Sequence, residues 1–229
     1  MIPMLVLLPG MDGTGELFAP LIAELGADIE TLVVRYPNRA MDYAEHEAIA
    51  RAALPDRPFV LLGESFSGPV AISIAATAPS GLQGLILSAS FARCPLRFIQ
   101  LFGPALASLA LPPPPAFLTQ PYLMGRFATP ALRAAYRGSL RQASARTLAA
   151  RLRAIARVDV SQNMRQVAVP TLYLRAREDS VVPAGTGDAL LTMAQQGRLV
   201  DIEAPHMLLQ GNPVAAAQSI LDFLSDVSV

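Results

Sequence analysis

Lysine is absent from this 229-residue chain, so its 18 basic residues are all arginine, and they balance 18 acidic residues to a net charge of zero. A neutral chain with few aromatic residues among its arginines is not typical of nucleic-acid-binding proteins, so we expect no nucleic-acid partner. The only cysteine, Cys94, cannot form an internal disulfide, which favours a reducing compartment and predicts a cytoplasmic protein. Only two histidines, His46 and His206, can serve as a catalytic base.

Long apolar runs are also missing. The longest, Phe98 to Leu111, is too short to span a bilayer and is interrupted by Gly103 and Pro104. Residues 1–8 carry no basic leader and run into a glycine turn, so they are expected to form a strand and not a targeting segment. We therefore predict no stable membrane insertion. With 52% hydrophobic residues, the chain can bury one large core without disulfides or structural metals, and no metal site is expected.

Apolar runs typical of strands alternate with helical stretches in the first and last parts of the chain. Such alternation predicts an α/β fold, in which a mostly parallel sheet has helices on both faces. The expected strands are Met4 to Leu8, Thr31 to Tyr36, Phe59 to Leu62, Leu85 to Leu87, Thr171 to Leu174 and Leu199 to Ile202. The expected helices are Leu17 to Leu25, Tyr43 to Leu54, Pro69 to Ala78, Ala184 to Ala194 and Pro213 to Leu224.

Residues 91–165 interrupt this alternation with helical sequence and no strand. The segment holds 11 arginines and a single acid, Asp159, so the rest of the chain carries the compensating negative charge. Four consecutive prolines, residues 112–115, interrupt it, and helical sequence then continues from Arg133 to Arg157. We predict one core domain formed by residues 1–90 and 166–229, with residues 91–165 inserted as a helical lid.

The most informative residue is Ser65. It follows the apolar run Phe59 to Leu62 and precedes the helical stretch Pro69 to Ala78, so it falls at a sharp strand-to-helix turn that would expose its hydroxyl. The strict pattern of such a nucleophilic turn is Gly-x-Ser-x-Gly, and here Ser67 stands in place of the second glycine. A serine in this position can also be a simple helix N-cap.

Two further residues complete a possible catalytic set. A serine hydroxyl needs an imidazole as base and a carboxylate to orient that imidazole. His206 directly follows the last expected strand, and Asp179 follows the strand before it, which gives the chain order Ser, Asp, His. A helix cap for Asp179 and an ordinary loop position for His206 are the alternatives. His46 lies in a polar helical stretch and is expected to be exposed, and Glu178 is expected to face away from His206.

These residues resemble the α/β-hydrolase superfamily over nearly the whole chain. The resemblance includes residues 8–15, read as Leu-Pro-Gly-Met-Asp-Gly-Thr-Gly, and it implies a trimmed sheet of about six strands with an inserted helical lid and no cofactor. It also implies that the backbone amides of Met11 and Phe66 form an oxyanion hole. Relatives often have His-Gly where this chain has Pro9-Gly10. Asp12 either binds a polar group of the substrate or forms an Asx turn.

The resemblance implies a serine hydrolase that cleaves a carboxylic ester or thioester through an acyl-enzyme on Ser65. Two alternatives stay open. Acyl transfer to an alcohol is one, since the Pro-Gly-x-Asp-Gly-Thr-Gly loop is also similar to loops of plastid acyltransferases of this fold. A non-catalytic ligand-binding or signalling homologue is the other.

The lid gives the only indication of the substrate. It has an apolar half and an arginine-rich half, which favours an acyl chain with an anionic end, as in the pimeloyl-carrier methyl ester esterases that the chain loosely resembles. Arginines at every fourth position share one helical face, and they face either the acidic core of the same protein, an anionic ligand, or an acidic carrier or membrane surface. The candidate substrate-binding residues are Asp12, Phe98, Phe102, Phe117, Arg133, Arg137 and Arg141.

Overall fold

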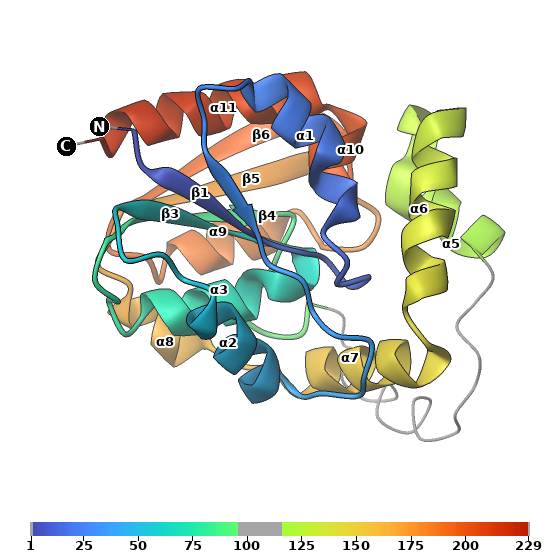
Figure 1. Ribbon diagram of the computed structural model, residues 1–229, viewed down its shortest axis with the longest axis horizontal. Coiled ribbons are helices and arrows are strands. Elements are labelled where there is room, and N and C mark those ends of the chain that lie inside the picture. Colours follow the sequence, from blue (N-terminus) through green and yellow to red (C-terminus); the bar gives the residue numbers. More distant parts are fainter. Residues whose placement is uncertain (1, 96–115, 229) are drawn as a thin grey trace.

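The computed structural model describes residues 2–95 and 116–228, and Figure 1 gives its architecture. Six strands of this described part form one sheet in the order β2-β1-β3-β4-β5-β6, and every neighbouring pair is parallel. The prediction of an α/β fold with about six strands is confirmed. The strands are β1 (Met4–Leu8), β2 (Thr31–Val33), β3 (Phe59–Glu64), β4 (Leu82–Ser88), β5 (Thr171–Glu178) and β6 (Gly197–Pro205).

The inner strands are continuous apolar runs because both faces of the sheet are covered. All six residues of β3 are buried, as are the last four residues of β1. In a parallel sheet, crossover helices pack on each face, so inner strands do not alternate between apolar and polar residues. Leu7 of β1 pairs with Leu62 of β3, which brings the carboxyl ends of both strands to the same edge of the sheet.

Helices cover the sheet in two layers (Figure 1). On one face, α1, α10 and α11 pack against the sheet, and Leu21 and Ile220 are fully buried there. On the other face lie α2, α3, α8 and α9, with Val70, Met164 and Leu190 in the core. The helices of these layers are α1 (Ala19–Leu25), α2 (Tyr43–Ala52), α3 (Gly68–Ala75), α8 (Ser161–Gln166), α9 (Gly185–Leu191), α10 (Leu208–Gly211) and α11 (Pro213–Asp226).

A helical insert separates β4 from β5, as expected. Besides α8, it contains α5 (Ala116–Met124), α6 (Pro130–Gln142) and α7 (Ala145–Arg157). In Figure 1, α5 and α6 stand beyond the edge of the sheet at which β5 and β6 end. The boundaries of core and lid at residues 90 and 166 stay a prediction. None of the helices in the described ranges, 2–95 and 116–228, is long and apolar enough to cross a membrane.

Two elements differ from the prediction. β2 ends at Val33 instead of Tyr36, because the chain then turns across the sheet edge and the Tyr36 amide donates to the Gly13 carbonyl. The long helix expected in the lid is two helices, α6 and α7. The break arises at Ser144, whose hydroxyl accepts from the Thr147 amide and so starts a new helix.

Candidate active site

Ser65 lies at the junction of β3 and α3, in a strained backbone conformation. Its φ of 45° is in the left-handed region, which a non-glycine residue adopts only where the surroundings enforce it. Ser90 helps to enforce it, because its Oγ donates to the Ser65 carbonyl at 2.6 Å. Close packing also requires small residues here. A Cβ on Gly63 would lie 2.8 Å from the Ala71 Cβ, and one on Gly68 would lie 1.7 Å from the Ser90 Oγ.

Ser67, which stands in place of the second glycine of the pattern, has a structural role of its own. Its hydroxyl donates to the Pro9 carbonyl in the loop after β1, and it lies 3.0 Å from the Tyr36 hydroxyl. The side chain is fully buried. Ser67 therefore ties the turn that carries Ser65 to the neighbouring loop.

His206 and Asp179 are brought to Ser65 by the strands that they follow. The Ser65 Oγ lies 2.9 Å from the His206 Nε2, and the His206 Nδ1 lies 2.9 Å and 3.0 Å from the two carboxylate oxygens of Asp179. The Asp179 Oδ1 also accepts from the amides of Val181 and Val182. The side chains of His206 and Asp179 are only 7% and 6% exposed, so the contact between them is shielded from water. The arrangement can move a proton from the hydroxyl to the imidazole.

His46 is buried, which contradicts the expectation that it is exposed. It lies on the inner face of α2, where its ring packs edge-on against the rings of Tyr36 and Phe66. Its Nδ1 lies 2.5 Å from the Asp42 carbonyl. Burial lowers the pKa of the His46 imidazole and keeps the ring neutral. The polar residues that surround it in the sequence lie on the outer face of the helix, so the local sequence was misleading.

An apolar cavity of about 390 Å³ adjoins Ser65 and His206. Aliphatic and aromatic side chains from both the core and the insert form most of its wall, so the cavity suits an apolar group next to the Ser65 hydroxyl. Its lining includes Leu17, Phe91, Tyr122, Leu123, Tyr136, Leu140, Leu148, Leu152, Ile155, Val181 and Met207.

The loop after β1 forms a tight turn beside Ser65. The Gly13 amide donates to the Gly10 carbonyl at 3.1 Å, which leaves Met11 and Asp12 as the two central residues of the turn. Met11 and Phe66, the predicted oxyanion-hole residues, both line the cavity with Ser65. The Asp12 carboxylate accepts from the Thr14 amide at 2.9 Å and from the Thr14 hydroxyl at 2.5 Å, so it forms the Asx turn considered above.

Glu64, the residue before Ser65, is a buried acid that borders the cavity. Its Oε1 accepts from the Gln210 Nε2 at 2.9 Å. Burial raises the pKa of the Glu64 carboxyl to about 7, and nearby Asp12 adds to this rise, whereas the Gln210 hydrogen bond opposes it. An acid that changes charge near neutral pH thus lies beside Ser65.

We expect Glu64→Gln to stabilise the protein in alkaline solution. The folded-state pKa is raised, so the stability due to the protonated form is present below the unfolded pKa, near 4.5, and is lost as pH rises through about 7. A pKa shift of this size lowers the free energy of unfolding by about 3 kcal/mol above pH 8, relative to its value at low pH. Urea unfolding at pH 5, 7 and 9 should therefore show a gain for Glu64→Gln that grows with pH. Glu24→Gln, at an exposed position of α1, is the control. An equal effect of Glu64→Gln at all three pH values would contradict the prediction.

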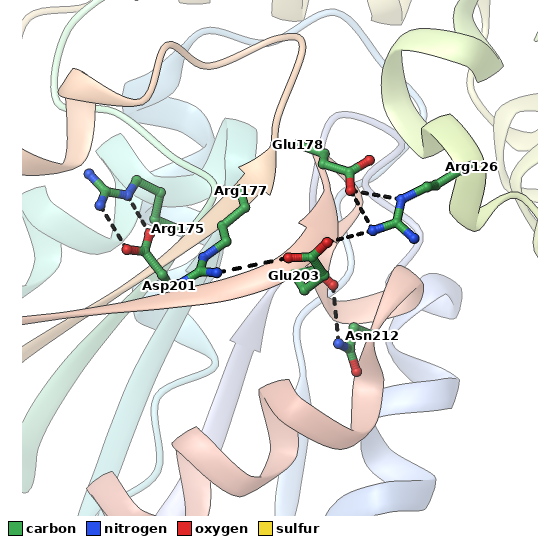
Figure 2. A network of polar contacts seen from close by, with 7 residues as sticks. All are labelled: Arg126, Arg175, Arg177, Glu178, Asp201, Glu203 and Asn212. Carbon is green, nitrogen blue, oxygen red and sulfur yellow. Dashed lines mark hydrogen bonds and ion pairs between the residues drawn. The ribbon is translucent and has the colours of Figure 1, made fainter.

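A charged network joins the insert to the ends of β5 and β6, shortly before Asp179 and His206 (Figure 2). Arg126, just after α5, contacts the Glu178 carboxylate at 2.7 Å and the Glu203 carboxylate at 2.5 Å. Glu178 thus pairs with Arg126 and not with His206. Exposed ion pairs contribute at most about 1 kcal/mol each, so the network holds the insert against the sheet edge only weakly.

The other predicted substrate-binding residues are not gathered at the cavity. Arg133, Arg137 and Arg141 are exposed on α6, and none of them belongs to the cavity lining. Tyr136 and Leu140 occupy the inner face of the same helix instead. Phe98 and Phe102 lie outside the described residues, as does the side chain of Phe117. Within the described chain, no group of three His, Cys, Asp or Glu side chains is placed to hold a metal ion.

Sequence reasoning missed two residues next to the site. Glu64 was visible as a charged residue between a buried strand and Ser65. Arg151 was visible as an arginine on the apolar stripe of α7, between Leu148 and Ile155. Charges on a buried face are rare unless they have partners, so both positions carried a recognisable signal.

Comparison with known proteins agrees with this geometry. The model of a family described as serine aminopeptidase, S33, matches residues 31–210, which is most of the chain and includes Ser65, Asp179 and His206. The chain belongs to this α/β-hydrolase family.

Solved structures with the same fold include several α/β-hydrolases. The enol-lactonase from Burkholderia xenovorans LB400 superposes with a TM-score of 0.86 at 17% identity, over 98% of this chain and 92% of that one. A thermophilic esterase from Thermogutta terrifontis gives a TM-score of 0.84 at 21% identity, over 100% and 91% of the two chains. At these identities, the likeness establishes the fold of this α/β-hydrolase.

A curated relative has a higher sequence identity to this chain, over a shorter region. Phytyl ester synthase 1, chloroplastic, from Arabidopsis thaliana is 32% identical over 135 residues, which cover 53% of this chain and 18% of the relative. This α/β-hydrolase therefore spans less than a fifth of that protein's length.

Proposed function

We propose that the protein is a serine hydrolase that cleaves carboxylic esters or thioesters through an acyl-enzyme on Ser65. One observation carries the proposal: an unbroken series of hydrogen bonds runs from the Ser65 Oγ through His206 to Asp179 at the wall of an apolar cavity. A hydroxyl so placed is activated by an adjacent base, and the base is oriented by a buried carboxylate.

The reaction then follows from these groups. As the Ser65 Oγ attacks the acyl carbonyl, its proton passes to the His206 Nε2, and Asp179 stabilises the imidazolium. The amides of Met11 and Phe66 donate to the oxyanion. His206 returns the proton to the leaving alcohol or thiol, which leaves the acyl group on Ser65. Water, deprotonated by His206, attacks the acyl-enzyme, the bond from the acyl carbon to the Ser65 Oγ breaks, and His206 returns the proton to Oγ as the acid leaves.

The cavity supports an apolar acyl group as the substrate class. Its wall offers aliphatic and aromatic side chains, and burial of each methylene contributes about 0.8 kcal/mol, or about fourfold in binding. We expect kcat/KM for p-nitrophenyl esters to rise by up to about this factor per methylene until the cavity is filled, and then to level off. An aminoacyl p-nitroanilide should be a poor substrate. Flat dependence on chain length, or preference for the anilide, would contradict the apolar-acyl proposal.

A fluorophosphonate probe separates this proposal from a non-catalytic, ligand-binding role. The probe reacts covalently only with an activated serine, so it should label the wild type and leave Ser65→Ala unlabelled. Labelling that survives the substitution would place the reactive residue elsewhere. An unlabelled wild type that still binds esters would support the non-catalytic alternative.

Acyl transfer to an alcohol is the second candidate, favoured by the likeness to phytyl ester synthase 1. Both reactions pass through the same acyl-enzyme and differ only in the acceptor. Product analysis with a long-chain alcohol added to the ester assay distinguishes them. A new ester in place of free acid would establish transfer as the main activity.

The exposed arginines on the surface of the insert support a substrate with an anionic group or an acidic carrier, and this stays part of the proposal. The side chains of Arg133, Arg137 and Arg141 are exposed, and no acid of the described residues pairs with them. If they bind an anionic group, replacing all three with Gln should raise KM for a carboxylate-terminated or carrier-linked ester more than for a neutral one. Equal changes would exclude this role. Removing three exposed charges of the core, at Arg39, Arg57 and Arg198, is the control for loss of positive charge alone.

A further inference from the structure

Arg151 is an unusual residue for the interior of this protein. It belongs to α7 of the insert, yet it is only 1% exposed and is among the largest fully buried side chains. A buried arginine costs free energy unless its donors are satisfied. Its Nη1 donates to the Met11 carbonyl and to the Asp12 carbonyl, both at 2.8 Å. The guanidinium thus binds the backbone of the turn that contains Met11, one of the two residues of the proposed oxyanion hole.

The turn is shaped to receive this guanidinium. Gly13 has a φ of 74°, and a Cβ there would lie 2.5 Å from the Arg151 Nη2. Any larger residue at position 13 would push the guanidinium away, apart from the strain of its own backbone. The same guanidinium lies 6.0 Å from the ring centre of Phe66. Arg151 therefore binds the backbone of Met11 and lies over the ring of Phe66, the two residues whose amides are the proposed oxyanion donors.

The hydrogen bonds from Arg151 to the Met11 and Asp12 carbonyls hold the turn in one orientation. In a turn closed by the Gly13 amide and the Gly10 carbonyl, the amide of the first central residue, Met11, takes no part in the closing bond. That amide is free to donate to a substrate oxygen. The Met11 amide shares its planar peptide unit with the Gly10 carbonyl, which accepts from the Gly13 amide. The carbonyls of Met11 and Asp12 belong to the next two units, so the Arg151 hydrogen bonds hold the rest of the turn and leave only the backbone torsions of Met11 to reorient its amide.

We propose that Arg151 is a positioning residue that holds the Met11 amide in its oxyanion-binding orientation and so couples the insert to the catalytic turn. The proposal rests on the proposed function. Without the hydrogen bonds from Arg151, the ester still binds in the cavity, but the tetrahedral intermediate loses the well-placed Met11 amide as a donor. Oxyanion donors act mainly on the transition state, so the loss falls on kcat and not on KM.

The test compares Arg151→Met, Arg151→Lys and Arg146→Met. Arg146 is an exposed arginine of the same helix, so its substitution removes the same charge without touching the turn. With a short p-nitrophenyl ester, we expect Arg151→Met to lower kcat about 10-fold to 100-fold with KM changed less than about 3-fold. Arg151→Lys should recover most of this loss, because an ammonium can also donate to two carbonyls. Arg146→Met should match the wild type.

A pair of inhibitors adds a readout that general loosening of the fold would not produce. Butylboronic acid forms a tetrahedral adduct with the serine and places an oxygen at the oxyanion site, whereas methyl butyl ether only fills the cavity. Arg151→Met should weaken inhibition by the boronic acid in proportion to its loss of kcat and leave inhibition by the ether unchanged. If Arg151→Met does not fold, the same ratio is measured with Arg151→Lys, where a smaller selective loss is expected.

Each outcome decides a separate claim. A wild type that turns over no ester and is not labelled by a fluorophosphonate overturns the proposed function. An active wild type with equal activity in Arg151→Met and Arg146→Met overturns the role of Arg151. Parallel weakening of both inhibitors, or no recovery in a folded Arg151→Lys, would make Arg151 a merely structural residue and also overturns the proposal.

Discussion

Replacing Ser65 by alanine is expected to lower kcat for a short aliphatic ester by about 10⁴-fold to 10⁶-fold, with little change in folding stability. The Ser65 Oγ forms the bond to the acyl group in the proposed mechanism, so without it the acyl-enzyme cannot form. The substitution removes one polar atom from a partly exposed side chain and leaves the backbone turn intact. Steady-state kinetics and thermal melting of both proteins measure the two effects.

His206→Ala should cost a comparable factor, and the double variant with Ser65→Ala should cost little more. The two side chains act as one unit, since every proton that the imidazole moves in the proposed mechanism serves to form or to break the acyl bond to Ser65, whose Oγ lies 2.9 Å from it. His46→Ala is not a useful control because that ring is buried. Additive losses in the double variant would mean that Ser65 and His206 act in independent steps, which is incompatible with the proposed mechanism.

Asp179→Asn is expected to lower kcat by about 10⁴-fold while the fold is retained. The Asp179 Oδ1 accepts from the amides of Val181 and Val182, at 2.7 Å and 2.8 Å, so the oxygen of an asparagine will stay on these amides. The asparagine nitrogen then takes the place of Oδ2 and donates to the His206 Nδ1. The neutral ring must carry its proton on Nε2, where it can no longer accept the proton of Ser65.

Glu178→Gln is the matched control for this prediction. It removes a carboxylate from the adjacent residue, but that carboxylate pairs with Arg126 at the surface. We expect less than about a threefold change in kcat and a small loss of stability. Kinetics of both variants between pH 6 and pH 9 provide the measurement. A large loss in Glu178→Gln with a small loss in Asp179→Asn would assign the acid to Glu178.

The reactive turn was predictable because its geometry depends on neighbours in the sequence. Few backbone conformations are possible where a buried apolar strand leads through a glycine and a serine into a helix. The φ of Ser65 agrees with the strained turn expected there. Asp179 and His206 were predictable from position alone, since parallel strands end at one edge of the sheet and residues after β5 and β6 must lie near it.

The error at His46 has a physical cause. The burial of this polar residue depends on how α2 packs against distant segments, and its immediate neighbours in the sequence do not reveal it. The arginines of α6 were candidate substrate-binding residues, with the acidic core or an acidic carrier as alternatives, and their role stays a prediction. The inner face of that helix carries Tyr136 and Leu140. Periodicity shows that residues share a face, whereas the packing of the helix decides whether that face is inside or outside.

The sequence by itself determined the α/β fold, the order of the strands along the chain and the three residues that meet at Ser65, because apolar periodicity and strand ends are local properties of the chain. Only the tertiary structure decided which side chains surround that meeting point. The raised pKa of Glu64 and the contact of Arg151 with the Met11 carbonyl both arise from burial between segments far apart in the sequence. Burial of this kind depends on how the insert packs over the sheet, which no local pattern encodes.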